Sequence, residues 1–274
     1  MAVRNELEDL RRWITNRRRV FVLTGAGCST ASGIPDYRDE RGEWKRRPPV
    51  MYQAFRNEAA TYRRYWARAF AGWPRFTAAE PSAAHHALAA WERTGSLSRL
   101  VTQNVDGLHQ RAGSRDVIDL HGRLDTVLCL GCGERTSRTS VQTLMAASNR
   151  EWHAAAVAAP DGDADIDAPL VDEFAAPRCL SCSGLLKPDV VFFGENVPDA
   201  RYADARDALA RADALLVVGS SLMVYSGFRF VRQAHDAGLP IAIVNRGDTR
   251  GDAFAELKVE GDVGTILTQI IAST

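Results

Sequence analysis

The chain has 274 residues, a mass of 30.0 kDa and a formal net charge of zero at pH 7. This length suits one large domain or two small ones and allows a substantial core. A balanced charge gives no overall field for nucleic acid or an anionic membrane, so we expect neither as a partner. The longest apolar runs, 214–218 and 241–244, have strand length and are too short to span a bilayer.

The N-terminal segment and the cysteines indicate a cytoplasmic protein. Residues 1–19 lack the apolar stretch of a signal peptide. Of the five cysteines, four form two Cys-x-x-Cys pairs. Cysteines in a reducing compartment seldom form disulfides, so these pairs indicate metal binding or redox chemistry.

Apolar segments that run into small or polar residues recur along the chain. After an amphipathic helix predicted at 7–16, the strand-like segment 20–24 leads into Gly-Ala-Gly. Segments 100–102, 214–218 and 241–244 have the same character. Continuous apolar strands are typical of a parallel sheet covered on both faces, and ligands bind at the carboxyl ends of such strands.

Helices are predicted between these strands, at 62–70, 83–93, 202–211 and 228–237. The alternation predicts an α/β fold with a doubly wound, Rossmann-like parallel sheet. Two stretches do not fit that sheet and are interpreted as insertions into a single catalytic domain. We expect a Rossmann-like part at 1–38, 82–125 and 185–274, a helical insertion rich in Arg, Trp and Tyr at 39–81, and a second insertion at 126–184 that contains both cysteine pairs.

The glycine-rich turn after the first strand is a candidate phosphate site. Gly25 and Gly27 let backbone N–H groups approach an anion closely. Thr30 replaces the third glycine of G-x-G-x-x-G, and no Gly-Lys-Ser/Thr follows, so neither common nucleotide motif is present. A purely structural turn remains the alternative. The adjacent Cys28 is interpreted as a packed thiol rather than a nucleophile.

The two cysteine pairs are the strongest local signal. Together they offer four thiolates, with 46 residues between the pairs. Four thiolates suit a tetrahedral structural zinc, and a long loop between the pairs costs little entropy. A redox dithiol or an iron–sulfur site is the alternative. We expect one Zn²⁺, without a catalytic role, held by Cys129, Cys132, Cys179 and Cys182.

Polar residues after two strands are candidates for catalysis. Asn104 and Asp106 follow strand 100–102, where they could grip ribose hydroxyls or a carboxamide, or simply cap the next helix. His121 follows the short strand 117–119 and suits general base work, although most of the six histidines should be structural. The acidic loop 161–174 faintly resembles a calcium loop, but Ile166 stands where Gly is required, so calcium is rejected.

Taken in chain order, these motifs resemble the sirtuins over residues 17–270. The matching segments are Gly25-Ala26-Gly27-x-Ser29, Gly33-Ile34-Pro35-Asp36-Tyr37-Arg38, Thr102-Gln103-Asn104-Val105-Asp106, His121-Gly122, the two cysteine pairs, Lys187-Pro188-Asp189-Val190-Val191-Phe192-Phe193-Gly194-Glu195 and Gly219-Ser220-Ser221. Segments 64–68, 72–74 and 159–163 further resemble the class II branch.

The resemblance implies an NAD-dependent protein-lysine deacylase that transfers the acyl group to ADP-ribose and releases nicotinamide. His121 would be the base, with Asn104 and Asp106 as further catalytic residues. The resemblance implies these cofactor contacts: Gly25, Ala26, Gly27, Ser29, Asp36, Tyr37, Arg38, Gln103, Asn104, Val105, Asp106, Gly219, Ser220, Ser221 and Asn245. It implies that the acyl-lysine protein adds a strand against these residues: Val191, Phe192, Phe193, Gly194, Met223 and Val224.

Alternatives remain for the activity. The same site could serve a protein ADP-ribosyltransferase or a longer-chain deacylase or lipoamidase. A nucleotide-gated zinc module without turnover is a third interpretation. Tyr37 stands where many sirtuins have Phe. The acyl preference, the physiological substrates and the oligomeric state are left open.

Overall fold

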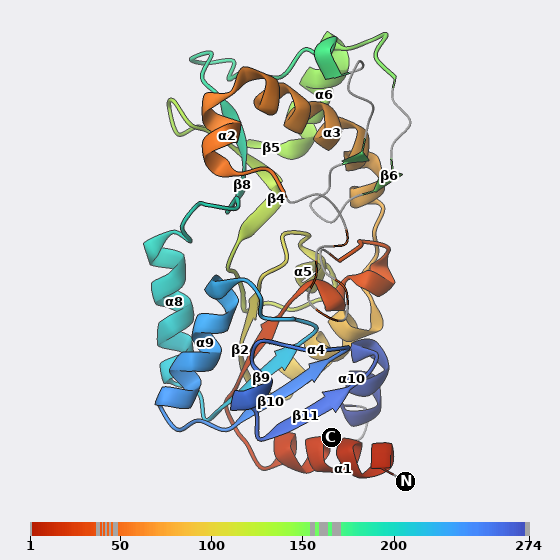
Figure 1. Ribbon diagram of the computed structural model, residues 1–274, viewed down its shortest axis with the longest axis vertical. Coiled ribbons are helices and arrows are strands. Elements are labelled where there is room, and N and C mark those ends of the chain that lie inside the picture. Colours follow the sequence, from red (N-terminus) through yellow and green to blue (C-terminus); the bar gives the residue numbers. More distant parts are fainter. Residues whose placement is uncertain are drawn as a thin grey trace.

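The structure is a computed structural model that describes residues 2–36, 39, 41, 43, 45, 49–153, 157–158, 164–165 and 171–271. Tyr37, Arg38 and most of the acidic loop 161–174 lie outside these described residues. Figure 1 shows a large sheet flanked by helices in the lower part and a smaller mixed part above it. Among the described residues, no helix combines the length and the apolar character needed to cross a membrane.

The large sheet has six parallel strands in the order β11-β10-β9-β1-β2-β3. Their bounds are β1 Val20–Thr24, β2 Leu97–Thr102, β3 Val117–Asp119, β9 Ala214–Val218, β10 Ile241–Asn245 and β11 Leu257–Glu260. The chain goes from β1 outward to β2 and β3 on one side, and β9 to β11 extend on the other. The order therefore reverses between β1 and β9, where open α/β sheets bind their ligands.

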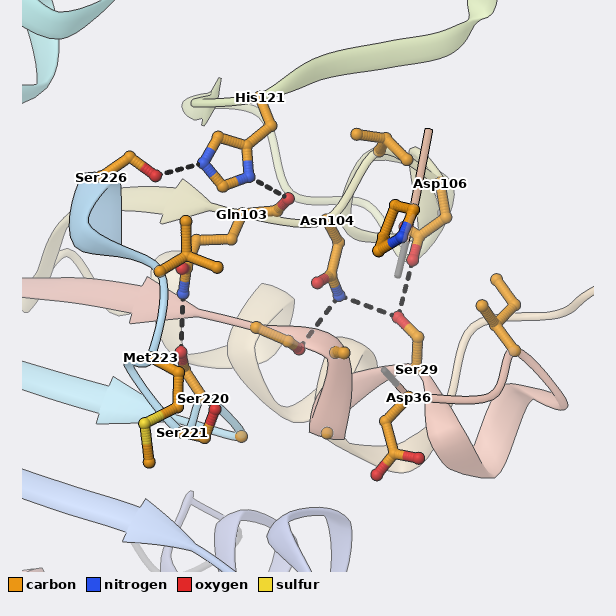
Figure 2. A pocket seen from close by; sticks show the side chains of 18 of the residues that line it. Ser29, Asp36, Gln103, Asn104, Asp106, His121, Ser220, Ser221, Met223 and Ser226 are labelled. Carbon is orange, nitrogen blue, oxygen red and sulfur yellow. Dashed lines mark hydrogen bonds between the residues drawn. The ribbon is translucent and has the colours of Figure 1, made fainter. Parts of the chain in front are cut away.

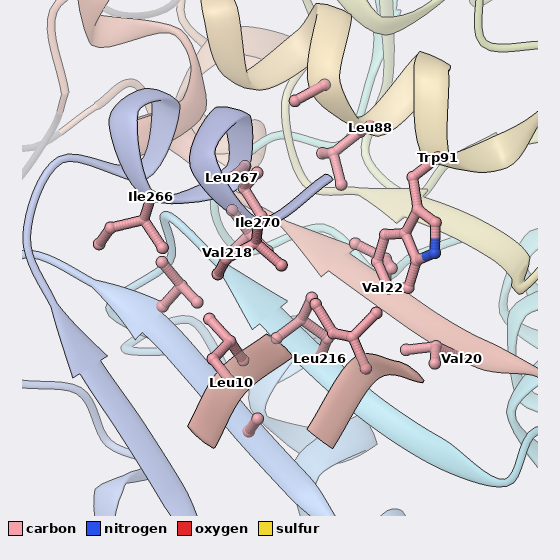
Figure 3. Close-up of a cluster of buried hydrophobic side chains, with 14 of the residues drawn as sticks. Leu10, Val20, Val22, Leu88, Trp91, Leu216, Val218, Ile266, Leu267 and Ile270 are labelled. Atoms are coloured by element: carbon pink, nitrogen blue, oxygen red, sulfur yellow. The ribbon is translucent and has the colours of Figure 1, made fainter. Parts of the chain in front are cut away.

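Helices cover both faces of this sheet, which explains why its central strands are apolar along their whole length. On one face α1 (Ala2–Thr15), α4 (Ala83–Glu92) and α10 (Val263–Ile271) enclose a core that includes Leu10, Trp91, Leu216 and Leu267 (Figure 3). On the other face lie α8 (Asp199–Ala210) and α9 (Tyr225–Asp236). This arrangement confirms the predicted doubly wound fold.

A second, antiparallel sheet carries the cysteines. Its strands are β4 (Gly122–Cys129), β5 (Arg135–Ser137) and β8 (Leu186–Val190), in the order β5-β4-β8. The other elements of this part are α2 (Tyr52–Asn57), α3 (Ala59–Thr77), α6 (Arg138–Ser148), β6 (Val157–Ala158) and β7 (Ala164–Asp165). One aromatic core, with Phe55, Trp66, Trp152 and Phe192, joins α2 and α3 to this sheet. The two insertions predicted from the sequence are therefore packed against each other.

Helix α3 extends beyond the predicted end at residue 70, although it contains Pro74. Proline has no N–H to donate to the carbonyl of Phe70. Gln142 of α6 donates to that carbonyl instead, at 3.0 Å. The buried guanidinium of Arg138 donates to the Ala69 carbonyl at 3.0 Å and lies 4.6 Å from the ring centre of Trp73. Gln142 of α6 thus supplies the hydrogen bond that the Phe70 carbonyl cannot receive from Pro74.

Other differences from the predicted elements are smaller. The sequence did not predict β11, α6 or α10, and short helices such as α5 (Leu108–Arg111) carry too little pattern to be recognised.

Candidate active site

Two glycine-containing turns meet at the carboxyl ends of β1 and β9. The Gly27 N–H donates to the Gly219 carbonyl at 2.8 Å. A Cβ on Gly27 would lie 2.9 Å from the Gly219 Cα, and a Cβ on Gly25 would lie 2.7 Å from the Ser220 Cβ. Gly219 itself has φ of +61°. Glycine is therefore required here by close backbone approach, and the turns form a narrow cradle at the switch point of the sheet.

Asn104, Ser29 and Asp106 form one hydrogen-bonded group beside this cradle (Figure 2). The Ser29 hydroxyl donates to Asp106 Oδ2 at 2.7 Å, since a carboxylate can only accept. Asn104 Nδ2 donates to Ser29 Oγ and to the Gly25 carbonyl, both at 3.0 Å. Asp106 Oδ1 accepts the Leu108 N–H at 2.9 Å. Asn104 Oδ1 takes no part in these bonds and can accept a hydrogen bond from a ligand.

The ring of His121 is held at both nitrogens (Figure 2). Nδ1 lies 2.9 Å from the carbonyl oxygen of Gln103, and Nε2 lies 2.7 Å from Ser226 Oγ. Burial lowers the pKa of His121 to about 4, the Gln103 carbonyl opposes that shift, and Arg201 adds to it. The imidazole is therefore neutral at pH 7, which is the protonation state that a general base requires.

A cavity of about 740 Å³ unites these groups. Of the residues that the structure describes, all those predicted to contact the cofactor or substrate line this cavity, as does His121. Asp36 pairs with Lys45, Nζ to Oδ1, at 2.6 Å. Asn245 is buried and donates from Nδ2 to the Arg246 carbonyl at 2.9 Å. The structure thus brings together residues from the loops that follow five strands of the large sheet, namely β1, β2, β3, β9 and β10.

The segment 191–194 forms one wall of the cavity, and Met223 and Val224 also line it. The Val191 N–H donates to the His121 carbonyl at 2.8 Å, which ties this wall to the histidine. Below it, the buried ammonium of Lys187 lies 3.0 Å from Glu195 Oε2 and donates to the Val190 carbonyl at 2.6 Å. Glu195 Oε2 also accepts the Phe192 N–H at 2.9 Å. The Lys187–Glu195 ion pair therefore connects the residues that precede and follow segment 191–194.

Two buried histidines behind the cavity were not singled out from the sequence. His85 Nδ1 accepts the Ser82 N–H at 3.0 Å, and His109 Nε2 lies 2.9 Å from Thr24 Oγ1. Their ring centres are 4.6 Å apart. Burial lowers the pKa of His85 to about 4 and lowers the pKa of His109 well below its usual range. The spacing of the two histidines in the sequence does not predict this contact, because His85 lies on α4 and His109 lies on α5.

Cys28 is a packed thiol, as predicted. It is 1% exposed, and its Sγ lies 3.6 Å from the Val218 carbonyl. Burial raises the pKa of this thiol to about 12. Since the thiolate is the nucleophilic form, Cys28 has no part in covalent chemistry near neutral pH.

The four paired cysteines converge at the end of the antiparallel sheet. All four sulfur atoms lie within 4.8 Å of one another, with 3.4 Å between the sulfurs of Cys129 and Cys182 and 3.7 Å between those of Cys132 and Cys179. Sulfurs about 2.3 Å from a tetrahedral zinc lie roughly 3.8 Å apart. The Gly131 N–H donates to Cys129 Sγ at 3.3 Å, which suits a thiolate. The residues fit one structural Zn²⁺ with no open coordination position.

Comparison with known proteins decides the family. The Sir2 family model matches residues 25–226. A "NAD-dependent protein deacetylase" of Xanthomonas campestris pv. campestris is 60% identical over 92% of this chain and 86% of its own length. The chain is a sirtuin. The family match includes both glycine turns, His121 and the four cysteines.

Other relatives extend the comparison. The sirtuin is 53% identical to a "NAD-dependent protein deacetylase" of Bordetella bronchiseptica, over 98% of both chains. It is 48% identical to the human mitochondrial "NAD-dependent protein lipoamidase sirtuin-4", over 97% of this chain and 86% of that protein, in line with the class II resemblance.

Solved structures show the same fold. A structure described as "Sir2-p53 peptide-NAD+" has a TM-score of 0.78 at 29% identity, covering 97% of this sirtuin and 98% of that chain. A Sir2 enzyme bound to a propionylated peptide has a TM-score of 0.77 at 29% identity, covering 98% of both chains.

Proposed function

We propose that this sirtuin is an NAD-dependent protein-lysine deacylase that transfers the acyl group to ADP-ribose with release of nicotinamide. One observation carries the proposal. A neutral His121 and the Asn104–Ser29–Asp106 group line the same cavity as the glycine cradle, at the switch point between β1 and β9. A base and a dinucleotide cradle in one cleft fit this reaction better than a binding module without turnover.

The cavity fits NAD by its shape and its chemistry. Gly25, Gly27 and Gly219 donate their N–H groups to the carbonyls of Val218, Gly219 and Val244, which fixes the two turns against each other. The pyrophosphate is therefore assigned to the N–H groups of Ala26, Ser220 and Ser221, which line the cavity on these turns. Asn104 and Asp106 present amide and carboxylate groups for the ribose and the carboxamide, and Asn245, which lines the same cavity, is assigned to the second ribose. When bound, NAD supplies a ribose carbon that can lose nicotinamide and accept the acyl oxygen.

His121 is assigned the role of general base. Its Nδ1–H is fixed on the Gln103 carbonyl, so the lone pair lies on Nε2. Because the pKa is about 4, that lone pair is free of a proton at pH 7. His121 can then accept a proton from a ribose hydroxyl and return it later. Base assistance of this kind is worth roughly 10²- to 10⁴-fold in rate.

The acyl-lysine peptide is assigned to the gap between segment 191–194 and Met223–Val224. An extended peptide would add a strand between these two segments, a binding mode that gives affinity with little demand on side-chain sequence. Val224 is 37% exposed at this edge. Phe192 and Phe193 would line the passage of the acyl-lysine chain. We place this reaction in the cytoplasm, on the cysteine usage of the chain.

The four cysteines are assigned a structural role away from the chemistry. Four thiolates fill a tetrahedron, so the metal has no position for a substrate or a reactive water. We propose that 126–184 is a zinc module and 39–81 a cofactor-side insertion. The sheet part then comprises 1–38, 82–125 and 185–274.

A panel of acyl-lysine peptides tests the function. Purified protein is incubated with NAD and acetyl-, propionyl-, succinyl-, glutaryl- and lipoyl-lysine peptides, and the products are measured by mass spectrometry. We expect free lysine peptide, nicotinamide and O-acyl-ADP-ribose in equal amounts. ADP-ribosylated protein without peptide deacylation would overturn the proposal in favour of a transferase.

The 48% identity to a lipoamidase supports a second candidate, removal of longer acyl chains at the same site. The apolar residues at 191–193 suit such chains. Faster turnover of lipoyl-lysine than of acetyl-lysine peptide in the same panel would establish it.

Replacing His121 tests the assigned base. His121→Ala should lower deacylation about 10²- to 10⁴-fold while the far-UV circular dichroism and melting curve stay close to wild type. The control is His86→Ala, since His86 is exposed on α4 and outside the cavity. Wild-type turnover in His121→Ala would show that the residue is not the base.

A further inference from the structure

A serine at the start of α9 holds the nitrogen on which the proposed reaction depends. Ser226 Oγ lies 2.7 Å from His121 Nε2, a short hydrogen bond between residues 105 positions apart in the chain. In Figure 2 this serine and the Gln103 carbonyl lie on opposite sides of the imidazole. Ser226 was not selected from the sequence, because it lies outside every motif used to recognise the site.

The hydrogens of this contact can be placed in only one way for a neutral ring. The Gln103 carbonyl can only accept, so Nδ1 carries the hydrogen. Nε2 must then accept, and the Ser226 hydroxyl must donate. Once Nε2 gains a proton, the same hydroxyl can rotate and accept the new N–H. A hydroxyl serves both protonation states, whereas a methyl group serves neither and a carboxylate only accepts.

The position of Ser226 is fixed by the residue that follows it. A Cβ at Gly227 would lie 2.3 Å from Gln103 Oε1, so the start of α9 packs directly on the Gln103 side chain. Gln103 Nε2 donates to Ser220 Oγ at 2.7 Å, which fixes that side chain in turn. The two groups that hold His121, the Gln103 carbonyl and the Ser226 hydroxyl, therefore belong to one packed unit.

We propose that Ser226 is a positioning residue that orients His121 and follows its change of protonation state. In the free protein the hydroxyl donates to Nε2 and keeps the ring in the orientation that faces the cavity. For proton transfer the Ser226 hydroxyl first turns away from Nε2, whose single lone pair then accepts the proton of a substrate hydroxyl. The substrate O–H bond breaks with its electron pair left on the substrate oxygen, and an N–H bond forms at Nε2. The Ser226 oxygen accepts that N–H once the substrate oxygen has reacted. No atom of Ser226 is exchanged. This inference rests on the base role proposed for His121.

Kinetics of three variants test the inference. Ser226→Ala should lower kcat for deacylation about 3- to 10-fold, the effect of one lost neutral hydrogen bond, with KM for NAD and peptide within about two-fold of wild type. Ser226→Thr keeps the hydroxyl and should restore most of kcat. Ser148→Ala makes the same change at an exposed site on α6 and should have no effect. Wild-type kcat in Ser226→Ala, or equal losses in the Ala and Thr variants, would overturn the inference.

Nuclear magnetic resonance of the free protein supplies a second measurement that needs no turnover. With ¹⁵N-labelled histidine at pH 7.5, the His121 signals are assigned by their loss in His121→Ala. We expect Nδ1 to carry the proton, and the Nε2 signal to move in Ser226→Ala but not in Ser226→Thr. An unmoved Nε2 signal would rule out the contact. If wild-type protein shows no deacylation, the proposed function fails, and this spectrum still decides whether Ser226 holds His121.

Discussion

The backbone contact between the two glycine turns is the most restrictive feature at the scale of single residues. Gly27 and Gly219 approach so closely that a methyl group on either would meet main-chain atoms rather than a movable side chain. Main-chain atoms at the ends of two central strands cannot shift without disturbing the sheet. A substitution here should therefore affect both stability and the shape of the cradle.

Gly27→Ala should lower the free energy of unfolding by about 1–3 kcal/mol, the usual effect of overpacking, and should weaken NAD binding at least tenfold. The added Cβ would lie 2.9 Å from the Gly219 Cα, so the turns must separate. Urea unfolding and calorimetric titration with NAD measure the two effects. An unchanged Kd for NAD would contradict the role of this turn as the phosphate cradle.

Site residues that belong to a distinctive sequence pattern could be predicted from the sequence, whereas site residues that stand alone could not. The glycines, the cysteine pairs and the Asn104–Asp106 segment each follow a strand or keep a fixed spacing, so their position in the fold was predictable. Ser226, His85 and His109 act through contacts with distant segments. A single serine or histidine in a helix gives no periodic or spacing signal, and only the folded chain shows its partner.

At the scale of elements, the cysteine-bearing loops depend on their metal. The loop at 129–132 follows β4, the loop at 179–182 precedes β8, and 46 residues separate the two cysteine pairs along the chain. Binding of a structural zinc contributes on the order of 10 kcal/mol to the folding of such a module. Loss of one thiolate opens the tetrahedron.

Cys129→Ser should lose most of the zinc and lower the melting temperature. Zinc per chain is measured by atomic absorption after gel filtration, and melting by calorimetry. Cys28→Ala is the matched control, because this buried thiol lies away from the four others and its loss should leave one zinc per chain. A full zinc content with wild-type melting in Cys129→Ser would contradict the four-thiolate site.

The segment after β8 depends on a buried ion pair for its shape. Lys187 and Glu195 bracket residues 190–194, and their side chains are only 6% and 24% exposed. The lysine also donates to the Val190 carbonyl, and the glutamate accepts the Phe192 N–H. Removing one charge would leave the other without its counter-ion in a largely buried setting.

Glu195→Gln should therefore destabilise the protein by about 1–3 kcal/mol and raise KM for the peptide more than KM for NAD. The amide keeps the size of the side chain and can still accept from Phe192. Asp207→Asn breaks the exposed pair with Arg206 and should change stability by less than about 1 kcal/mol. Equal KM values for wild type and Glu195→Gln would show that the pair does not shape the peptide wall.

At the scale of the whole molecule, the sheet was easier to predict than the part above it. Strands buried on both faces have a continuous apolar pattern, so β1, β2, β9 and β10 were recognised along with the class of fold. The packing of α3 on α6 was not, because it depends on the bond from Arg138 to the Ala69 carbonyl and on the bond from Gln142 to the Phe70 carbonyl, which Pro74 leaves without its helical donor. Such contacts join segments about 70 residues apart and follow no local rule.

The same burial that keeps the histidines neutral should make the whole protein sensitive to acid. His85 has a pKa of about 4 when folded and about 6.5 when unfolded, and His109 is shifted in the same direction. Between these values the unfolded chain binds protons that the folded chain does not, so stability falls as pH falls from 6.5 to 4. His85 alone contributes a loss on the order of 3 kcal/mol across that window.

Urea unfolding at pH 7 and pH 5 measures this loss in wild type and in two variants. His85→Gln removes one group that must gain a proton on unfolding, so the difference between the two pH values should shrink. His86→Gln changes an exposed neighbour on the same helix and should leave that difference intact. Comparing variants cancels the contribution of carboxylates, which titrate alike in all three proteins. If His85→Gln and wild type lost equal stability between pH 7 and pH 5, the buried imidazole would have to be charged in the folded protein, and the network behind the cavity would need a different protonation state.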